Sequence, residues 1–130
     1  MRQWLDDLED RTQRFGIDIV NLAEDLEAAR VPNSVIWQLT RAGTSVAANH
    51  RACRRARNDR ELLAKLAIVD EEADEAVLWL ELVSKSRRGS KVQAVAAVFV
   101  EATRLRGLFS ASRATVRRRV EEEDSRKQKR

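Results

Sequence analysis

The sequence predicts an all-α protein, an antiparallel up-down-up-down four-helix bundle, and three observations support this prediction. Apolar residues recur every three or four positions along four separate stretches, which places them on one stripe of each helix. The composition favours helix, because 35% of the 130 residues are charged and only four are glycine and one is proline. The stretches are joined by short connections, so consecutive helices must be antiparallel neighbours.

The first two helices are expected at residues 2–29 and 33–56. Pro32 suits the first turn of the second helix, and Arg30 and Val31 form the expected break before it. The first apolar stripe consists of Leu5, Leu8, Thr12, Phe15, Ile19, Leu22, Leu26 and Ala29. The second consists of Val35, Leu39, Ala42, Val46, Asn49, Cys53 and Ala56.

Two residues of the second helix are unusual for their positions. Asn49 is polar on an apolar stripe, and if buried it needs hydrogen-bond partners and would fix the helix register. Gly43 inside a helix costs up to about 1 kcal/mol relative to alanine. We therefore expect another backbone to approach closely at Gly43, and we interpret Asn49 as structural.

The third helix is expected at residues 59–85. Asn58, followed three residues later by Glu61, indicates a capping box at its start. Its apolar stripe consists of Leu62, Leu66, Val69, Ala73, Ala76, Leu80 and Val83.

The fourth helix is expected at residues 91–119, with Ser90 and Gln93 as a second capping box. Its stripe consists of Val95, Val98, Ala102, Leu105, Phe109, Ser112 and Val116. The charged segment 121–130 has no apolar stripe, so we expect one folded domain over 1–120 and a disordered tail.

Three tryptophans fall away from the stripes. Trp37 lies opposite the stripe of the second helix, and Trp4 and Trp79 lie on the flanks of theirs. A contiguous exposed apolar patch usually marks an interface, so these residues are candidates for an oligomer or partner interface. The alternative is a thicker bundle that buries flanking positions, and it suits Trp4 and Trp79 better than Trp37.

Arginines are concentrated at the ends of the second and fourth helices, which run toward the same end of an up-down-up-down bundle. Such a basic pole would bind phosphates without sequence specificity and in a salt-sensitive way. The alternative is that these cations stabilise helix C-termini and are otherwise only solvated. The residues expected to contact RNA or DNA are Arg51, Arg54, Arg55, Arg57, Arg117, Arg118 and Arg119.

An acidic block lies in the middle of the third helix, over residues 70–75. Antiparallel pairing of the second and third helices places Arg41 level with Glu75. An ion pair across this hairpin or between subunits is the simplest interpretation. The alternative is an acidic surface that docks a basic partner.

The sequence lacks the patterns typical of catalytic and metal sites. His50 is the only histidine and Cys53 the only cysteine, which excludes a disulfide within the chain and a thiolate-rich metal site. Cys53 lies on an apolar stripe and is expected to be a small buried hydrophobe. We expect no enzyme, cofactor, metal or small-molecule substrate. We also expect a soluble cytoplasmic protein, because no apolar run is long enough to span a membrane and the N-terminus is acidic.

The segment 38–82 resembles a bacterial four-helix-bundle family first named for proteins encoded in 23S ribosomal RNA intervening sequences. The matching residues are Gln38, Arg41, Ala42, Ser45, Val46, Asn49, Lys65, Leu66, Ile68, Glu72, Glu75, Trp79 and Leu80. Farther on, the segment LFSASRATVRR is similar to the closing helix of the family, with Ser112 and Thr115 in matching places. The resemblance covers roughly residues 12–118. Ala52 departs from it, because many members have glutamate there.

The resemblance implies a four-helix bundle that assembles as a homopentameric ring. It also implies kinship with the accessory variability proteins of diversity-generating retroelements, which are basic pentamers that bind nucleic acid and a reverse transcriptase. Our leading hypothesis is a non-enzymatic, ring-forming RNA- or DNA-binding accessory protein that partners a reverse transcriptase. The alternative is an oligomeric interaction scaffold that docks a protein through Trp37 or the acidic face and has no direct nucleic-acid role.

Overall fold

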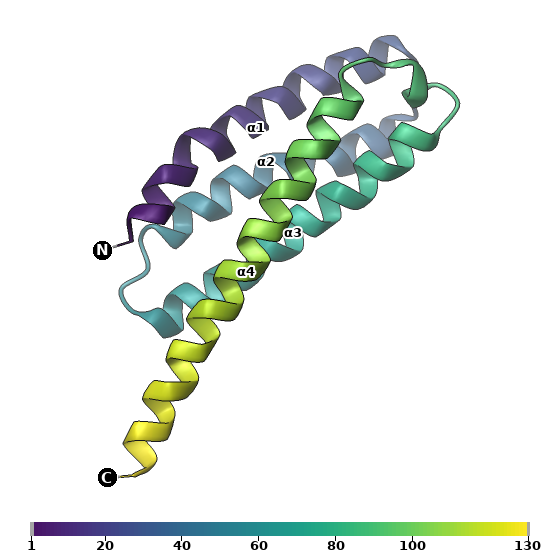
Figure 1. The fold of residues 1–130 in the computed structure, drawn as a ribbon. Coiled ribbons are helices and arrows are strands. Elements are labelled where there is room, and N and C mark those ends of the chain that lie inside the picture. The colour runs from purple at the N-terminus through teal and green to yellow at the C-terminus, as the bar shows by residue number, and fades with distance from the viewer. Residues whose placement is uncertain (1, 130) are drawn as a thin grey trace.

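The computed structural model describes residues 2–129, which form an antiparallel bundle of four α-helices without strands (Figure 1). The helices are α1 (Gln3–Ala28), α2 (Asn33–Cys53), α3 (Asp59–Lys85) and α4 (Val95–Gln128), and a single 3₁₀ turn, Gly89–Lys91, lies between α3 and α4. Successive helices run in opposite directions, as Figure 1 shows. The predicted all-α four-helix fold is confirmed.

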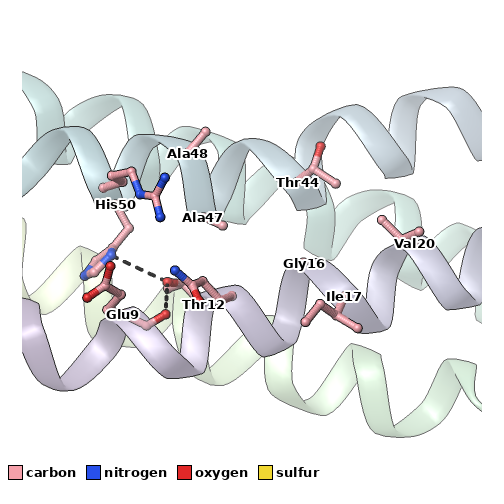
Figure 2. A pocket seen from close by; sticks show the side chains of 11 residues that line it. Glu9, Thr12, Gly16, Ile17, Val20, Thr44, Ala47, Ala48 and His50 are labelled. Carbon is pink, nitrogen blue, oxygen red and sulfur yellow. Dashed lines mark hydrogen bonds between the residues drawn. The ribbon is translucent and has the colours of Figure 1, made fainter.

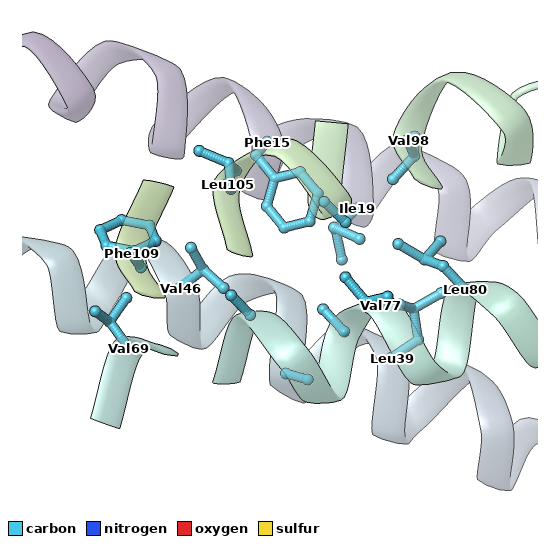
Figure 3. Packing of buried hydrophobic residues seen from close by; sticks show 14 of the residues in the cluster. Phe15, Ile19, Leu39, Val46, Val69, Val77, Leu80, Val98, Leu105 and Phe109 are labelled. Atoms are coloured by element: carbon cyan, nitrogen blue, oxygen red, sulfur yellow. The ribbon is translucent and has the colours of Figure 1, made fainter. Parts of the chain in front are cut away.

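The predicted apolar stripes form one hydrophobic core between the four helices. Phe15 and Ile19 from α1 meet Val46 from α2 and Leu105 and Phe109 from α4 (Figure 3), and all five are at most 2% exposed. Full burial of such a side chain stabilises the fold by about 1.5–3 kcal/mol. The bundle therefore follows directly from the spacing of these residues.

Two of the predicted helix boundaries, the end of α1 and the start of α3, are explained by local conformation and hydrogen bonding. Arg30 adopts a left-handed conformation with φ 63°, and this reverses the chain between α1 and α2. The side chain of Asn58 accepts a hydrogen bond from the Glu61 backbone N–H at 2.8 Å and caps α3. The carboxylate of Glu61 pairs with Arg57 at 3.2 Å.

The predicted start of the fourth helix is wrong. Ser90 lies in the 3₁₀ turn, and α4 begins at Val95 without a side-chain cap. Gly89 explains the extra turn, because a Cβ at this position would lie 2.3 Å from the carbonyl oxygen of Val83. The chain therefore packs tightly against the end of α3 before α4 begins.

The predicted end of the fourth helix, and the disordered tail after it, are also wrong. α4 continues to Gln128 and extends past the ends of the other helices (Figure 1). Val120 is the last buried residue of α4. Beyond it the helix has ion pairs from Lys127 to Glu123, at 3.2 Å, and from Asp124 to Arg60 of α3. The segment is rich in Glu, Arg, Lys and Gln, which have high helix propensity, so it remains helical without an apolar stripe. Residue 130 lies outside the described residues.

The stripe of α2 differs from the prediction at one position. His50 is only 1% exposed, whereas Asn49 is half-buried and donates from its side chain to the Ser45 carbonyl at 2.8 Å. At about 100° per residue, positions 49 and 50 lie on opposite sides of the line through Val46 and Cys53, and α1 covers the side of His50, whose Nδ1 lies 3.5 Å from Thr12 Oγ1. Asn49 therefore does not fix the register from within the core.

Gly43 is a point of close approach, as predicted, but the neighbour is a side chain and not a backbone. A Cβ at Gly43 would lie 2.6 Å from Cγ1 of Ile19, which is fully buried. The absence of a side chain at Gly43 therefore provides the space that Ile19 of α1 occupies.

Candidate interaction surfaces

An ion cluster centred on Arg41 joins α2 and α3 on the outside of the bundle. The guanidinium of Arg41 contacts Glu72 at 3.2 Å and also pairs with Glu75. The predicted Arg41–Glu75 pair therefore forms within the hairpin. All three residues are partly exposed, so we expect the cluster to set the alignment of the two helices more than their stability.

The polar residues that carry the family resemblance lie along the same boundary between α2 and α3 as the Arg41 cluster. Gln38, Arg41, Ser45 and Asn49 follow one another at helical spacing on α2, and all four are half-buried. On α3 the half-buried residues at matching spacing are Lys65, Glu72, Glu75 and Trp79. We call this strip, together with its exposed apolar flanks, the α2–α3 face.

The flanks of the α2–α3 face are apolar. Trp37 is 63% exposed and lies one turn before Arg41, and Leu78 and Leu82 are 48% and 49% exposed on the turns that follow Glu75. Ile68 is 48% exposed on the other side of the cluster. The structure thus exposes a tryptophan on α2 and several aliphatic side chains on α3.

The other two tryptophans are less exposed. Trp4 and Trp79 are half-buried and pack against the hydrophobic core. Trp79 Nε1 is buried and has no hydrogen-bond partner among the described residues. The expectation of a thicker bundle describes both residues, and Trp37 is the exposed tryptophan.

The two arginine clusters do share one pole, as predicted, because α2 ends and the second half of α4 arrives at the same end of the bundle (Figure 1). The pole is nevertheless mixed in charge. Arg54 pairs with Asp6 at 2.8 Å and with Glu9 at 2.6 Å, both from α1. Arg119 lies 3.9 Å from Asp59.

The remaining arginines divide into paired and unpaired groups. Arg57 pairs with Glu61 and is therefore a paired residue, like Arg54 and Arg119. Within residues 2–129, four predicted arginines are exposed and have no carboxylate within 4.0 Å, and these are Arg51, Arg55, Arg117 and Arg118. Arg51 lies in the last turn of α2 and Arg55 just beyond that helix, whereas the other two lie on α4. α3 packs against both helices. The pole thus offers two small basic sites.

A groove of about 700 Å³ runs along the outer side of the α1–α2 hairpin. Figure 2 shows Glu9, Thr12 and His50 toward one end and Ile17, Val20 and Thr44 toward the other. The lining residues are Glu9, Thr12, Gln13, Gly16, Ile17, Val20, Thr44, Ala47, Ala48, His50 and Arg51. This α1–α2 groove was not among the sites predicted from the sequence. The small residues Gly16 and Ala47 are the signal that could have indicated it.

His50 lies at the polar end of the α1–α2 groove. Its Nδ1 is 3.5 Å from Thr12 Oγ1, and its Nε2 is buried without a hydrogen-bond partner among the described residues. Burial lowers the pKa of the imidazole and is the largest effect. The Leu5 carbonyl opposes it, the Arg54 charge lowers the pKa further, and Glu9 and Asp6 raise it by smaller amounts. His50 is therefore neutral at pH 7.

Cys53 is fully buried, and burial raises the pKa of its thiol to about 11. The thiol is protonated at neutral pH and is a poor nucleophile. No three His, Cys, Asp or Glu side chains within residues 2–129 are placed to hold a metal ion. None of the helices in this range is long and apolar enough to cross a membrane.

A polar cleft lies on the outside of the α3–α4 hairpin. Asp70 accepts hydrogen bonds from Ser110 Oγ at 2.7 Å and from Arg113 at 3.2 Å. Asp74 pairs with Arg106 at 3.1 Å. Both aspartates of this cleft are thus paired with donors from α4.

Comparison with known proteins gives a structural likeness. No known family model and no curated protein matches the chain. The structure is similar to that of a protein of unknown function of the S23 ribosomal protein family from Bacteroides thetaiotaomicron. The TM-score is 0.69 at 27% sequence identity, over 80% of this chain and 95% of that one. This likeness supports the family resemblance and the fold, and it assigns no activity.

Proposed function

We propose that this chain is a non-enzymatic scaffold that self-associates through its α2–α3 face. The observation that carries the proposal is the exposure of Trp37, at 63%, one turn before Arg41 on α2, and Leu78 and Leu82 on α3 are also about half-exposed. Tryptophan is among the residues most enriched at the energetic centres of protein interfaces. The neighbouring Arg41 cluster supplies a polar rim that fixes orientation.

Burial of apolar side chains would supply most of the favourable free energy of association. Burial of one large apolar side chain contributes about 1.5–3 kcal/mol, so burial of Trp37 with two leucines offsets much of the cost of association. The homopentameric ring is a finer proposal that rests on the family resemblance. A closed ring of more than two subunits needs two different complementary faces. Val100 and Leu108 on α4, 49% and 39% exposed, are candidates for the second face.

Sedimentation equilibrium or light scattering of the full chain tests self-association. We expect a molar mass of several protomers for the natural sequence and a shift toward monomer for Trp37→Ala. Ile17→Ala is the matched control, because Ile17 is 59% exposed on a different helix and should leave the mass unchanged. A monomeric natural chain at high micromolar concentration, or an unchanged mass for Trp37→Ala, contradicts the proposal.

A second candidate function is phosphate binding by the four unpaired arginines. Each is exposed and free of carboxylate partners within residues 2–129, unlike Arg54, Arg57 and Arg119, which would have to exchange an existing partner. Contacts of this kind give affinity without base readout and weaken with salt. This retains the nucleic-acid hypothesis with a smaller set of residues.

Fluorescence anisotropy with a labelled single-stranded RNA at about 50 and 200 mM salt tests this second function. We expect Arg117→Gln/Arg118→Gln to weaken binding and to reduce the salt dependence. Arg87→Gln/Arg104→Gln removes the same charge elsewhere and should have a smaller effect. Absence of binding at the lower salt concentration rules out the function.

Partnership with a reverse transcriptase rests on the family resemblance alone. Co-purification with a reverse transcriptase encoded beside this gene would support it. Failure of the two purified proteins to associate at micromolar concentration would reject it while leaving self-association intact.

A further inference from the structure

We propose that the α1–α2 groove binds a slender amphiphile with an anionic head group, of the long-chain carboxylate class. This site is distinct from the α2–α3 face and does not depend on it. Its apolar length would hold the hydrocarbon chain, and Arg51 would hold the carboxylate.

The shape of the groove suits a small molecule. Its volume of about 700 Å³ lies within the range of roughly 300–1,000 Å³ that is typical of ligand sites. Space between the two helices is available because Gly16 has no side chain and faces the small Ala47. Even a Cβ added at Gly16 would lie 3.8 Å from the Cβ of Ala47, which is ordinary van der Waals contact. Ile17, Val20 and Thr44 line the groove toward the end away from His50 (Figure 2).

The walls favour an apolar chain of limited length. Ile17 and Val20 are 59% and 49% exposed, so a ligand in the groove would remove both from water. Each buried methylene contributes about 0.8 kcal/mol. The groove follows α1 from residue 9 to residue 20, about 16 Å at the helical rise, which is close to the extended length of dodecanoate.

The charge at the polar end favours an anion. Glu9 is already paired with Arg54 at 2.6 Å, whereas Arg51 is exposed and has no carboxylate partner within residues 2–129. A guanidinium recognises a carboxylate through two parallel hydrogen bonds. The hydroxyl of Thr12 is engaged with the Leu8 and Glu9 carbonyls at 2.9 and 3.0 Å. Arg51 is therefore the group at this end that is free to bind the head group.

Calorimetric titration of the full chain with dodecanoate, below its micelle concentration, tests the site. We expect saturable binding of one molecule per protomer. Arg51→Gln should weaken it at least about tenfold, because a hydrogen bond to a charged group is lost. Dodecyltrimethylammonium, which has the same tail and the opposite charge, should bind at least as weakly. Arg87→Gln removes an exposed charge from the α3–α4 connection and should leave the affinity unchanged.

A second variant separates the groove from the other proposed functions. Ala48→Phe fills the groove from an exposed position, so it should abolish dodecanoate binding while the molar mass and RNA binding stay the same. Absence of saturable binding, equal affinity for the cationic amphiphile, or unchanged binding in Arg51→Gln and Ala48→Phe would overturn the proposal. A changed molar mass of Ala48→Phe would also overturn it, because the groove would then be a contact between protein chains.

Discussion

The α1–α2 and α3–α4 hairpins share one antiparallel geometry but differ in what fills the space between their helices. In the α1–α2 hairpin, Ile19 packs onto the bare surface of Gly43, and the outer side is an apolar groove. In the α3–α4 hairpin, the outer side is a charged cleft in which Asp70 accepts hydrogen bonds from Ser110 and Arg113. The outer side of one hairpin is therefore shaped by small residues, and that of the other by polar contacts.

The difference shows how two similar hairpins acquire different surfaces. Small residues let α1 and α2 approach closely, which leaves larger apolar neighbours such as Ile17 without cover. Between α3 and α4, Asp70 and Asp74 each meet a donor from the opposite helix, so these two carboxylates are already engaged. The apolar side is therefore the better candidate for binding.

The largest expected effect comes from Gly43→Ala. The new Cβ would lie within 3 Å of three carbon atoms of Ile19, a stiff, fully buried side chain. We expect a loss of about 1–3 kcal/mol in the free energy of unfolding despite the better helix propensity of alanine. Urea denaturation measures it. An equally stable variant would show that the α1–α2 packing is not determined by shape.

Asp70→Ala tests the polar hairpin in the same way. Removal of the carboxylate leaves Arg113, whose Nε is already buried without a partner among the described residues, with no ion pair. We expect a loss of about 1–2 kcal/mol. Ser110→Ala removes only one of the two donors and should cost less. If both variants were as stable as the natural chain in urea, the polar contacts would not stabilise the hairpin.

Mild acid should destabilise the α1–α2 hairpin through His50. The folded-state pKa of His50 is lowered, so the unfolded chain binds more protons, and stability falls as pH drops below the unfolded value of about 6.5. The loss cannot exceed about 1.4 kcal/mol per pH unit for one group. The charges around the imidazole are Asp6, Glu9 and Arg54.

Thermal unfolding at pH 7.5 and 5.5 measures this dependence, and His50→Gln is the control that removes the titrating group. The carboxyl of Glu101, whose pKa is lowered by the hydrogen bond from Arg11, loses its contribution only below its ordinary value of 4.5 and does not interfere. An equal pH dependence in His50→Gln would assign the effect to another group.

The smallest expected effect is a gain in stability from Gly107→Ala. A Cβ at Gly107 would meet no atom within 4 Å, so only helix propensity changes. We expect the free energy of unfolding to rise by up to about 1 kcal/mol. The opposite signs for Gly43 and Gly107, measured in the same urea titration, sharpen the contrast between the two hairpins. Destabilisation by Gly107→Ala would mean that this surface is covered by a partner.

Most of the fold could be predicted from local sequence. The stripe of α1 was predicted correctly from Leu5 to Leu26, because a helical period is set by each residue and its near neighbours. The Asn58 cap was predictable because its hydrogen bond spans only three residues. The Arg41–Glu75 pair was predictable because a short connection fixes the antiparallel alignment of α2 and α3. The exposure of Trp37 followed from its place opposite the stripe.

The candidate sites were less predictable, because they depend on residues far apart in the sequence. Arg54 is paired by Asp6, which lies 48 positions away, and Arg60 by Asp124, which lies 64 positions away. Sequence spacing alone treated all the arginines of the pole as equal. It also assigned the buried position of α2 to Asn49 and not to His50, because both positions flank the stripe and the packing of α1 decides which one is covered.

The sequence by itself determined that four amphipathic helices would form and in what order they would run, because helical periodicity and short connections are local properties. The tertiary structure decided which arginines keep a free charge and which side of the bundle is hollow. Those outcomes depend on distances between helices, and the fit of side chains such as Ile19 against Gly43 sets these distances.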